Sequence, residues 1–134
     1  MKITGLNHIT INVVDLEKSE EFYKTVLGLE GKGFIDMGDH TLTYFELPQK
    51  VRLELIKYVE KADKKEIEET TRGIYRHFCL ETDNLEEMKN ICLHKGIPVR
   101  KEPSYVEKLS CRTMLITDPN GCLLYTSPNL LYVK

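Results

Sequence analysis

Three side chains of types that bind metal ions stand out from the alternation of polar and apolar residues. His8 begins the run HITIN, Glu54 lies within RLELIKY, and His77 begins HFCLET. Successive side chains of a strand point to opposite faces, so each would lie on the polar face of its strand. Two neutral imidazoles and a carboxylate form a divalent-metal set that leaves coordination positions open for water or substrate. The alternative is that all three are only solvated on half-buried strands.

The elements that would position these residues occur twice along the chain. Residues 7–29 align with residues 76–98, and the alignment places His8 on His77. In each copy a strand that begins with His leads into an Asp or Asn turn and a helix of about three turns. We predict Asp15 as the cap of the first helix and an Asp83–Glu86 capping box for the second. A Gly then ends each helix.

Each predicted helix precedes three short strands, which gives the pattern strand, helix, three strands, twice over. The predicted strands cover residues 29–36, 41–47 and 51–58, and then 97–102, 109–117 and 122–127. The predicted fold class is α+β, with module one at about 1–59, a linker at about 60–72 and module two at about 73–134. The length of 134 residues suits one domain built from both modules.

Composition and charge exclude several classes of protein. With 41% hydrophobic residues and a net charge of −2, the chain is too apolar to be disordered and lacks the basic character of nucleic-acid binders. No apolar run reaches the roughly 18 residues of a membrane span. The start of the chain has no signal-peptide pattern, and the four cysteines are widely spaced. We therefore expect a cytoplasmic protein with reduced thiols.

The sequence resembles the vicinal oxygen chelate superfamily, which includes glyoxalase I, bleomycin-resistance proteins and extradiol dioxygenases, and it is closest in pattern to small glyoxalase-like proteins. The resemblance extends over nearly the whole chain, through residues 6–19 (LNHITINVVDLEKS), 22–28 (FYKTVLG), 53–56 (LELI), 76–85 (RHFCLETDNL) and 118–121 (DPNG). It implies two paired β-α-β-β-β modules whose mixed sheet curls around a central cavity. It also implies a homodimer that binds a small molecule.

The resemblance implies a metal site inside that cavity. The family's first three ligand positions fall on His8, Glu54 and His77, which would hold Ni, Zn, Mn or Fe as a divalent ion. The fourth position is commonly a Glu four residues after the Gly of D-P-D-G, and here it is Tyr125. A tyrosine has a pKa of about 10, so Tyr125 should act as a hydrogen-bond donor rather than as an anion.

Four functional hypotheses follow. The first is a glyoxalase-like lyase or isomerase that uses a divalent metal to chelate neighbouring oxygens of a small oxygen-rich substrate. Glu54 and Tyr125 would then be its catalytic residues. The alternative is a metal-free dimer that binds a small molecule or sequesters an antibiotic, as bleomycin-resistance proteins do, or a ring-cleaving, dioxygenase-like protein. The fourth is a catalytically silent dimer.

Overall fold

The computed structural model describes residues 1–60 and 77–127, and the side chains of 123–127 are not among the described parts. The chain divides into two units, Met1–Lys64 and Lys65–Lys134, and each is considered by itself below. The predicted linker at about 60–72 lies outside the described residues apart from Glu60.

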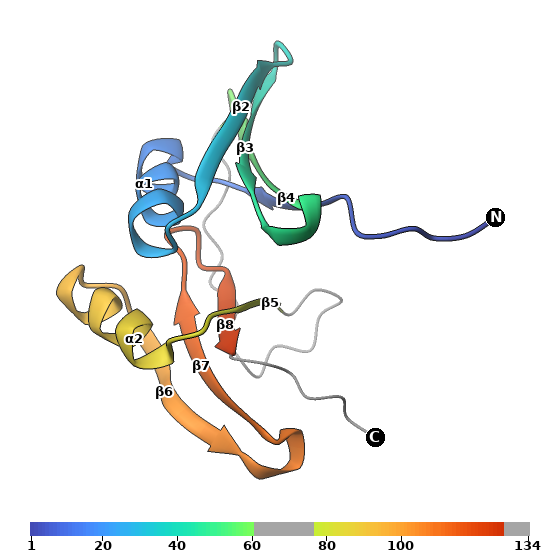
Figure 1. The fold of residues 1–134 in the computed structure, drawn as a ribbon. Helices are drawn as coiled ribbons and strands as arrows, with labels where there is room; N and C mark the ends of the chain where they lie inside the picture. The colour runs from blue at the N-terminus through green and yellow to red at the C-terminus, as the bar shows by residue number, and fades with distance from the viewer. Residues whose placement is uncertain (61–76, 128–134) are drawn as a thin grey trace. The chain divides into compact units, whose positions relative to one another are not determined.

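The first unit is a four-stranded mixed sheet with one helical segment (Figure 1). The strand order is β1-β4-β3-β2, in which β1 runs parallel to β4 and the other neighbours are antiparallel. Its elements in chain order are β1 (His8–Asn12), α1 (Leu16–Glu21), the π-helical turn η1 (Phe22–Val26), β2 (Glu30–Asp36), β3 (His40–Glu46), the 3-10 turn η2 (Pro48–Lys50) and β4 (Arg52–Tyr58).

The helical segment of this unit begins and ends where the sequence predicts, but it widens halfway. The Asp15 side chain accepts a hydrogen bond from the Lys18 N–H at 3.1 Å, and Gly28 ends the segment at φ +66°. After Glu21 the α-helix gives way to the π-helical turn η1. There the Thr25 hydroxyl donates to the Glu21 carbonyl at 2.7 Å, a side-chain bond that loosens regular helices.

One face of the first sheet is buried beneath this segment, which leaves the other face for polar residues. Phe22 and Tyr23 are buried, and the Tyr23 ring lies 6.0 Å from the ring of Phe45 on β3. Leu53 and Leu55 on β4 are also fully buried. Burial of these rings and aliphatic side chains is the main stabilising term for the unit.

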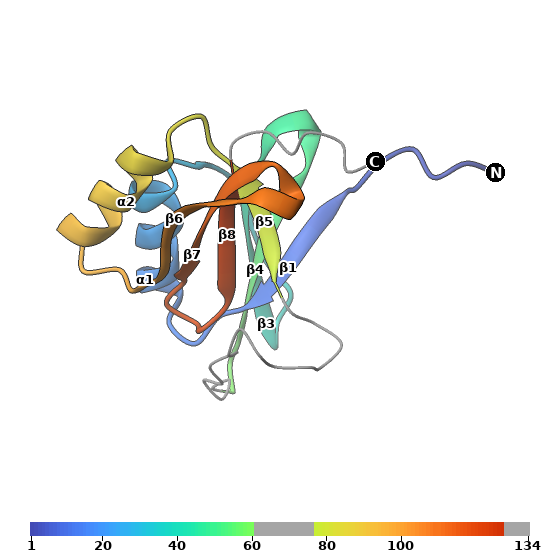
Figure 2. The same cartoon turned by 90° about the horizontal axis from the view of Figure 1, so that it is seen from below.

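The second unit repeats the same topology (Figure 2). Its strand order is β5-β8-β7-β6, with β5 parallel to β8 and the other neighbours antiparallel. Its elements are β5 (Phe78–Glu81), α2 (Leu85–His94), β6 (Val99–Val106), the 3-10 turn η3 (Glu107–Leu109), β7 (Cys111–Thr117) and β8 (Leu123–Ser127). The repeat predicted from the sequence is therefore a repeat of structure.

Two details of the second unit differ from the prediction. The cap of α2 is Asn84 rather than Asp83, because the Asn84 side chain accepts the Glu87 N–H at 3.0 Å. The strand predicted at residues 97–102 is also displaced, since β6 runs from Val99 to Val106. Ser110, at φ +52°, then separates the turn η3 from β7, so that strand starts later than the sequence indicates.

The fold class is α+β, and the two β-α-β-β-β modules are confirmed. The curled sheet shared by both modules around one cavity stays a prediction. Among the residues described, no helix is long and apolar enough to cross a membrane. All four cysteines are free thiols; burial raises the pKa of Cys92 to about 11 and that of Cys122 to about 12, with Asp118 adding to the latter.

Candidate metal and ligand site

Glu54 is a buried carboxylate on the face of the first sheet that does not contact the helical segment, and 8% of its surface is exposed. It pairs in register with Thr10 of β1 on one side and Tyr44 of β3 on the other. The Thr10 hydroxyl donates to its Oε1 at 3.0 Å, and the Tyr44 hydroxyl donates to its Oε2. Three neighbouring strands therefore hold this carboxylate in place through hydrogen bonds rather than leaving it to solvent.

The hydrogen bond to Glu54 also fixes the protonation state of Tyr44. That bond raises the pKa of the Tyr44 phenol, with burial and the Glu54 charge adding to the rise and Arg52 opposing it. A phenol whose pKa lies above its usual value of about 10 is neutral near pH 7. Tyr44 therefore acts as a donor to the carboxylate.

His8 lies on the same face of the sheet as Glu54. It is exposed, pairs in register with Arg52, and stands two positions before Thr10 on β1. Its Nδ1 lies 2.7 Å from the side-chain oxygen of Asn7. When Nδ1–H donates to that oxygen, Nε2 carries the lone pair, which is the arrangement that orients metal-binding histidines.

The second unit has a matching row of residues in which Tyr125 takes the place of Glu54. Tyr125 on β8 pairs in register with Cys79 of β5 and Leu115 of β7. By topology, Cys79 corresponds to Thr10 and Leu115 to Tyr44. The only acidic position of the first row is thus a phenol in the second.

His77 comes immediately before β5, whereas the sequence places it as the first residue of that strand. It is exposed and has an interaction partner. Of the predicted ligands, His8 and Glu54 belong to the first unit and His77 to the second. No cluster of three His, Cys, Asp or Glu side chains suited to a metal occurs within residues 1–60 and 77–127 as described. The three-ligand set therefore stays a prediction.

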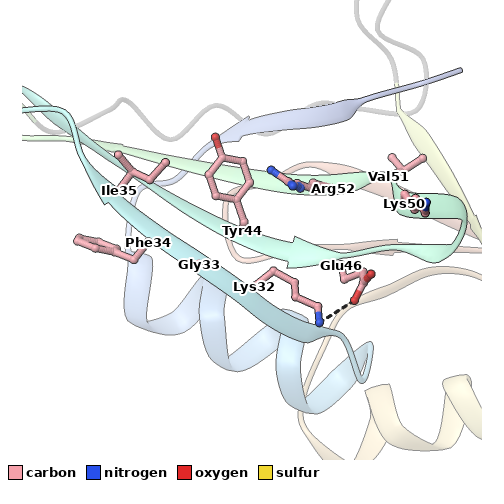
Figure 3. Close-up of a pocket in the computed structure, with 9 residues that line it drawn as sticks. All are labelled: Lys32, Gly33, Phe34, Ile35, Tyr44, Glu46, Lys50, Val51 and Arg52. Carbon is pink, nitrogen blue, oxygen red and sulfur yellow. Dashed lines mark ion pairs between the residues drawn. The ribbon is translucent and has the colours of Figure 1, made fainter. Parts of the chain in front are cut away.

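A pocket of about 570 Å³ opens beside Tyr44 on the first sheet (Figure 3). Its lining comes from β2, β3, η2 and β4, and it includes Lys32, Lys50 and Arg52. The Arg52 guanidinium lies 5.7 Å from the centre of the Tyr44 ring, within the range of a cation–π contact. Tyr44 thus contacts Arg52 with its ring and Glu54 with its hydroxyl.

The sequence predicts Glu54 as a site residue but does not point to Tyr44 or to the pocket with its three cationic side chains. A signal for Tyr44 exists in the run HTLTYFE, where Tyr44 alternates with the buried Thr43 and Phe45. Its pairing with Glu54 depends on the register of β3 against β4, which the sequence does not specify. The contact between Arg52 and the Tyr44 ring depends on the same register of β3 against β4.

A comparison with family models supplies the identification. The model of the Glyoxalase/Bleomycin resistance protein/Dioxygenase superfamily matches residues 5–125. The chain belongs to this superfamily. Superfamily members bind small molecules, often bind a divalent metal ion and often act as dimers. Comparison with curated protein sequences gives no significant match.

Several solved structures share the fold of this chain at low sequence identity. The crystal structure of SMU.1112c matches with a TM-score of 0.80 and 21% identity, covering 94% of this chain and 99% of that one. TnmS3, an antibiotic binding protein from Streptomyces sp. CB03234, matches with a TM-score of 0.74 and 18% identity, covering 96% and 98%.

Glyoxalase I from Zea mays is a longer relative. It matches with a TM-score of 0.78 and 21% identity, covering 94% of this chain but 45% of its own. The chain therefore spans less than half the length of the maize enzyme. At these identities the likeness shows the fold alone, since one fold hosts many activities.

Proposed function

We propose that this protein is a divalent-metal enzyme of the glyoxalase type, a lyase or isomerase that acts on a small oxygen-rich substrate. The observation that carries the proposal is the buried Glu54 carboxylate, which Thr10 and Tyr44 hold on the same sheet face as His8. Its family membership supports a homodimer with a small-molecule substrate, and the widely spaced free thiols fit a cytoplasmic protein.

The donor types fit a divalent metal. A carboxylate offers about four lone-pair positions, and Glu54 uses two of them for Thr10 and Tyr44. His8 presents Nε2 when Nδ1 donates to Asn7. His77, the repeat equivalent of His8, is the proposed third ligand. Nickel, zinc, manganese and iron in their divalent states all accept such nitrogen and oxygen donors.

The chain's own residues have distinct roles in this proposal. A bound metal ion would act as a Lewis acid toward two neighbouring oxygens of the substrate. Tyr44 and Thr10 keep the Glu54 carboxylate at a fixed orientation, so little reorganisation is needed when a ligand binds. Glu54 serves as ligand and proton acceptor, and Tyr125 donates a hydrogen bond to a developing oxyanion.

Calorimetric titration of chelator-treated protein with Ni²⁺, Zn²⁺ and Mn²⁺ tests the proposal. We expect one tight site per chain and a loss of affinity of at least about 10- to 100-fold in Glu54→Gln, because loss of even an indirect partner typically costs that much. The matched control is Glu17→Gln, which removes the same charge from an exposed residue of α1 in the same unit. Equal affinities for the two variants would contradict the proposal.

A second candidate function is metal-free binding of a small molecule. Two observations favour it: hydroxyl donors engage both oxygens of Glu54, and Tyr125 replaces the acid at the equivalent register position. TnmS3, which shares the fold, is an antibiotic binding protein. In this case the wild-type protein would retain no metal, and its ligand affinity would survive both His8→Ala and His77→Ala.

A further inference from the structure

The pocket on the first sheet carries more positive than negative charge, although the chain as a whole has a net charge of −2. Its lining contains three cationic side chains, Lys32, Lys50 and Arg52, and one acidic side chain, Glu46. A recess with an excess of one charge sign concentrates small ligands of the opposite sign.

The three cations are not equivalent. Lys32 Nζ pairs with Glu46 at 3.0 Å (Figure 3). It also lies 3.6 Å from Glu30, so carboxylates of its own sheet already satisfy its charge. Neither Arg52 nor Lys50 forms an ion pair with a carboxylate in the parts of the chain that the structure describes. Arg52 therefore has guanidinium N–H donors that no carboxylate of the described residues uses.

Arg52 is exposed, and its guanidinium contacts an aromatic ring of the same sheet. Its guanidinium lies over the Tyr44 ring at 5.7 Å, and the hydroxyl of the same Tyr44 donates to Glu54. The planar guanidinium presents five N–H donors in a fork that matches the oxygens of carboxylate and phosphate groups. Stacking on Tyr44 reduces the side-chain entropy that would be lost when such a group binds.

The turn that borders this pocket supports a built site. Gln49 and Lys50 both adopt left-handed backbone conformations, at φ 63° and 62°, in the connection between β3 and β4. Two successive non-glycine residues in this region cost free energy, and such strain concentrates at ligand sites. Lys50 of this turn lines the pocket, as Arg52 does.

We propose that Arg52 binds an oxyanion group of the substrate, a carboxylate or a phosphate, so that the substrate is a small anion. The inference rests on the proposed function in one respect, because it places the chelating oxygens of the substrate at Glu54. Arg52 and Glu54 are two residues apart on one face of β4, which separates their Cα atoms by about 7 Å. Substrates would therefore carry the anionic group roughly that far from the neighbouring oxygens.

Calorimetric titration of metal-free, chelator-treated protein with inorganic phosphate and with succinate tests this inference. We expect at least one of the two probes to bind, and the one that binds identifies the anion class. Arg52→Gln should weaken binding by roughly 10- to 100-fold, as expected for loss of hydrogen bonds to a charged group. Arg52→Lys should recover part of the affinity because it keeps the charge but loses the fork.

The matched control is Lys57→Gln, which removes one positive charge from an exposed residue on the opposite face of the same strand. It should change affinity by less than about twofold, given the screening of distant surface charges. Failure of the wild-type protein to bind either probe, or equal binding by Arg52→Gln, overturns the inference.

Metal titration of the same proteins separates the two proposals. If Arg52→Gln binds metal like the wild type but no longer binds the anion, both proposals stand. If the wild type binds the anion through Arg52 and retains no metal, the anion site stands and the metal enzyme fails. If metal binds and the anion affinity does not depend on Arg52, only the anion site fails.

Discussion

The hydrogen bond from Tyr44 to Glu54 gives a prediction that can be worked out from the structure. Tyr44→Phe removes only the hydroxyl, and Glu54 keeps its second donor, Thr10, at 3.0 Å. A hydrogen bond to a charged group contributes about 1.5–3 kcal/mol to stability. Tyr44 is half-buried, so water replaces part of the lost bond, and we expect a loss of about 1–2 kcal/mol in the free energy of unfolding.

Urea unfolding of the metal-free protein measures this loss, and a thermal scan should show a midpoint lower by about 4–8 °C. The control is Tyr105→Phe, because Tyr105 is 62% exposed and its hydroxyl forms no hydrogen bond with any residue that the structure describes. In a double-mutant cycle with Glu54→Gln, the coupling should approach about 1 kcal/mol. Equal stability of both Phe variants, or no coupling, refutes the reasoning.

The same bond predicts a dependence on alkaline pH. The pKa of Tyr44 is raised in the folded protein, first by the hydrogen bond to Glu54. Above the ordinary tyrosine pKa of about 10, the unfolded chain loses a proton that the folded chain keeps, so stability falls as pH rises toward the folded value. Tyr44→Phe should remove this part of the decline, and an unchanged slope would contradict the assignment.

Asp15→Ala removes the cap of the first helix, so we expect a loss of about 1 kcal/mol in urea unfolding, and no loss would show that the cap is not stabilising. Burial raises the pKa of both Cys92 and Cys79, but Cys92 is fully buried and Cys79 is exposed, so a thiol reagent at mildly alkaline pH should modify Cys79 and spare Cys92, as peptide mass spectrometry would show. Tyr125→Glu adds a carboxylate at the position equivalent to Glu54, and calorimetry should show metal affinity higher by about tenfold or more; unchanged affinity would mean that position 125 is not a ligand position.

Hydrophobic alternation and the internal repeat were sufficient to predict the order of strands and helices along the chain, because strand and helix periods differ and each module shows both in the same order. The helix cap and the π-helical turn depend on local side-chain hydrogen bonds that the periodicity does not show. Asn84 and Asp83 are both good caps, and each has a Glu three residues later, so the sequence alone does not choose between them. The π-helical turn after Glu21 involves a side-chain bond of Thr25 that periodicity does not reveal.

The candidate site was predictable to the level of a strand face. Alternation placed Glu54 opposite Leu53 and Leu55, and the structure has it there. Its burial and its donors depend on cross-strand register, which the strained turn at Gln49 and Lys50 sets. Because the same register brings Arg52 over Tyr44, the cationic pocket was also beyond the reach of sequence patterns.

The metal content of the dialysed protein tests the central claim most directly. After loading with excess Zn²⁺ or Ni²⁺ and exhaustive dialysis, the wild-type chain should retain one ion per chain, and so should His94→Ala, which removes an exposed histidine at the end of α2. His8→Ala and His77→Ala should each retain far less. One ion per chain in His77→Ala, or none in the wild type, would contradict a metal site built from His8, Glu54 and His77.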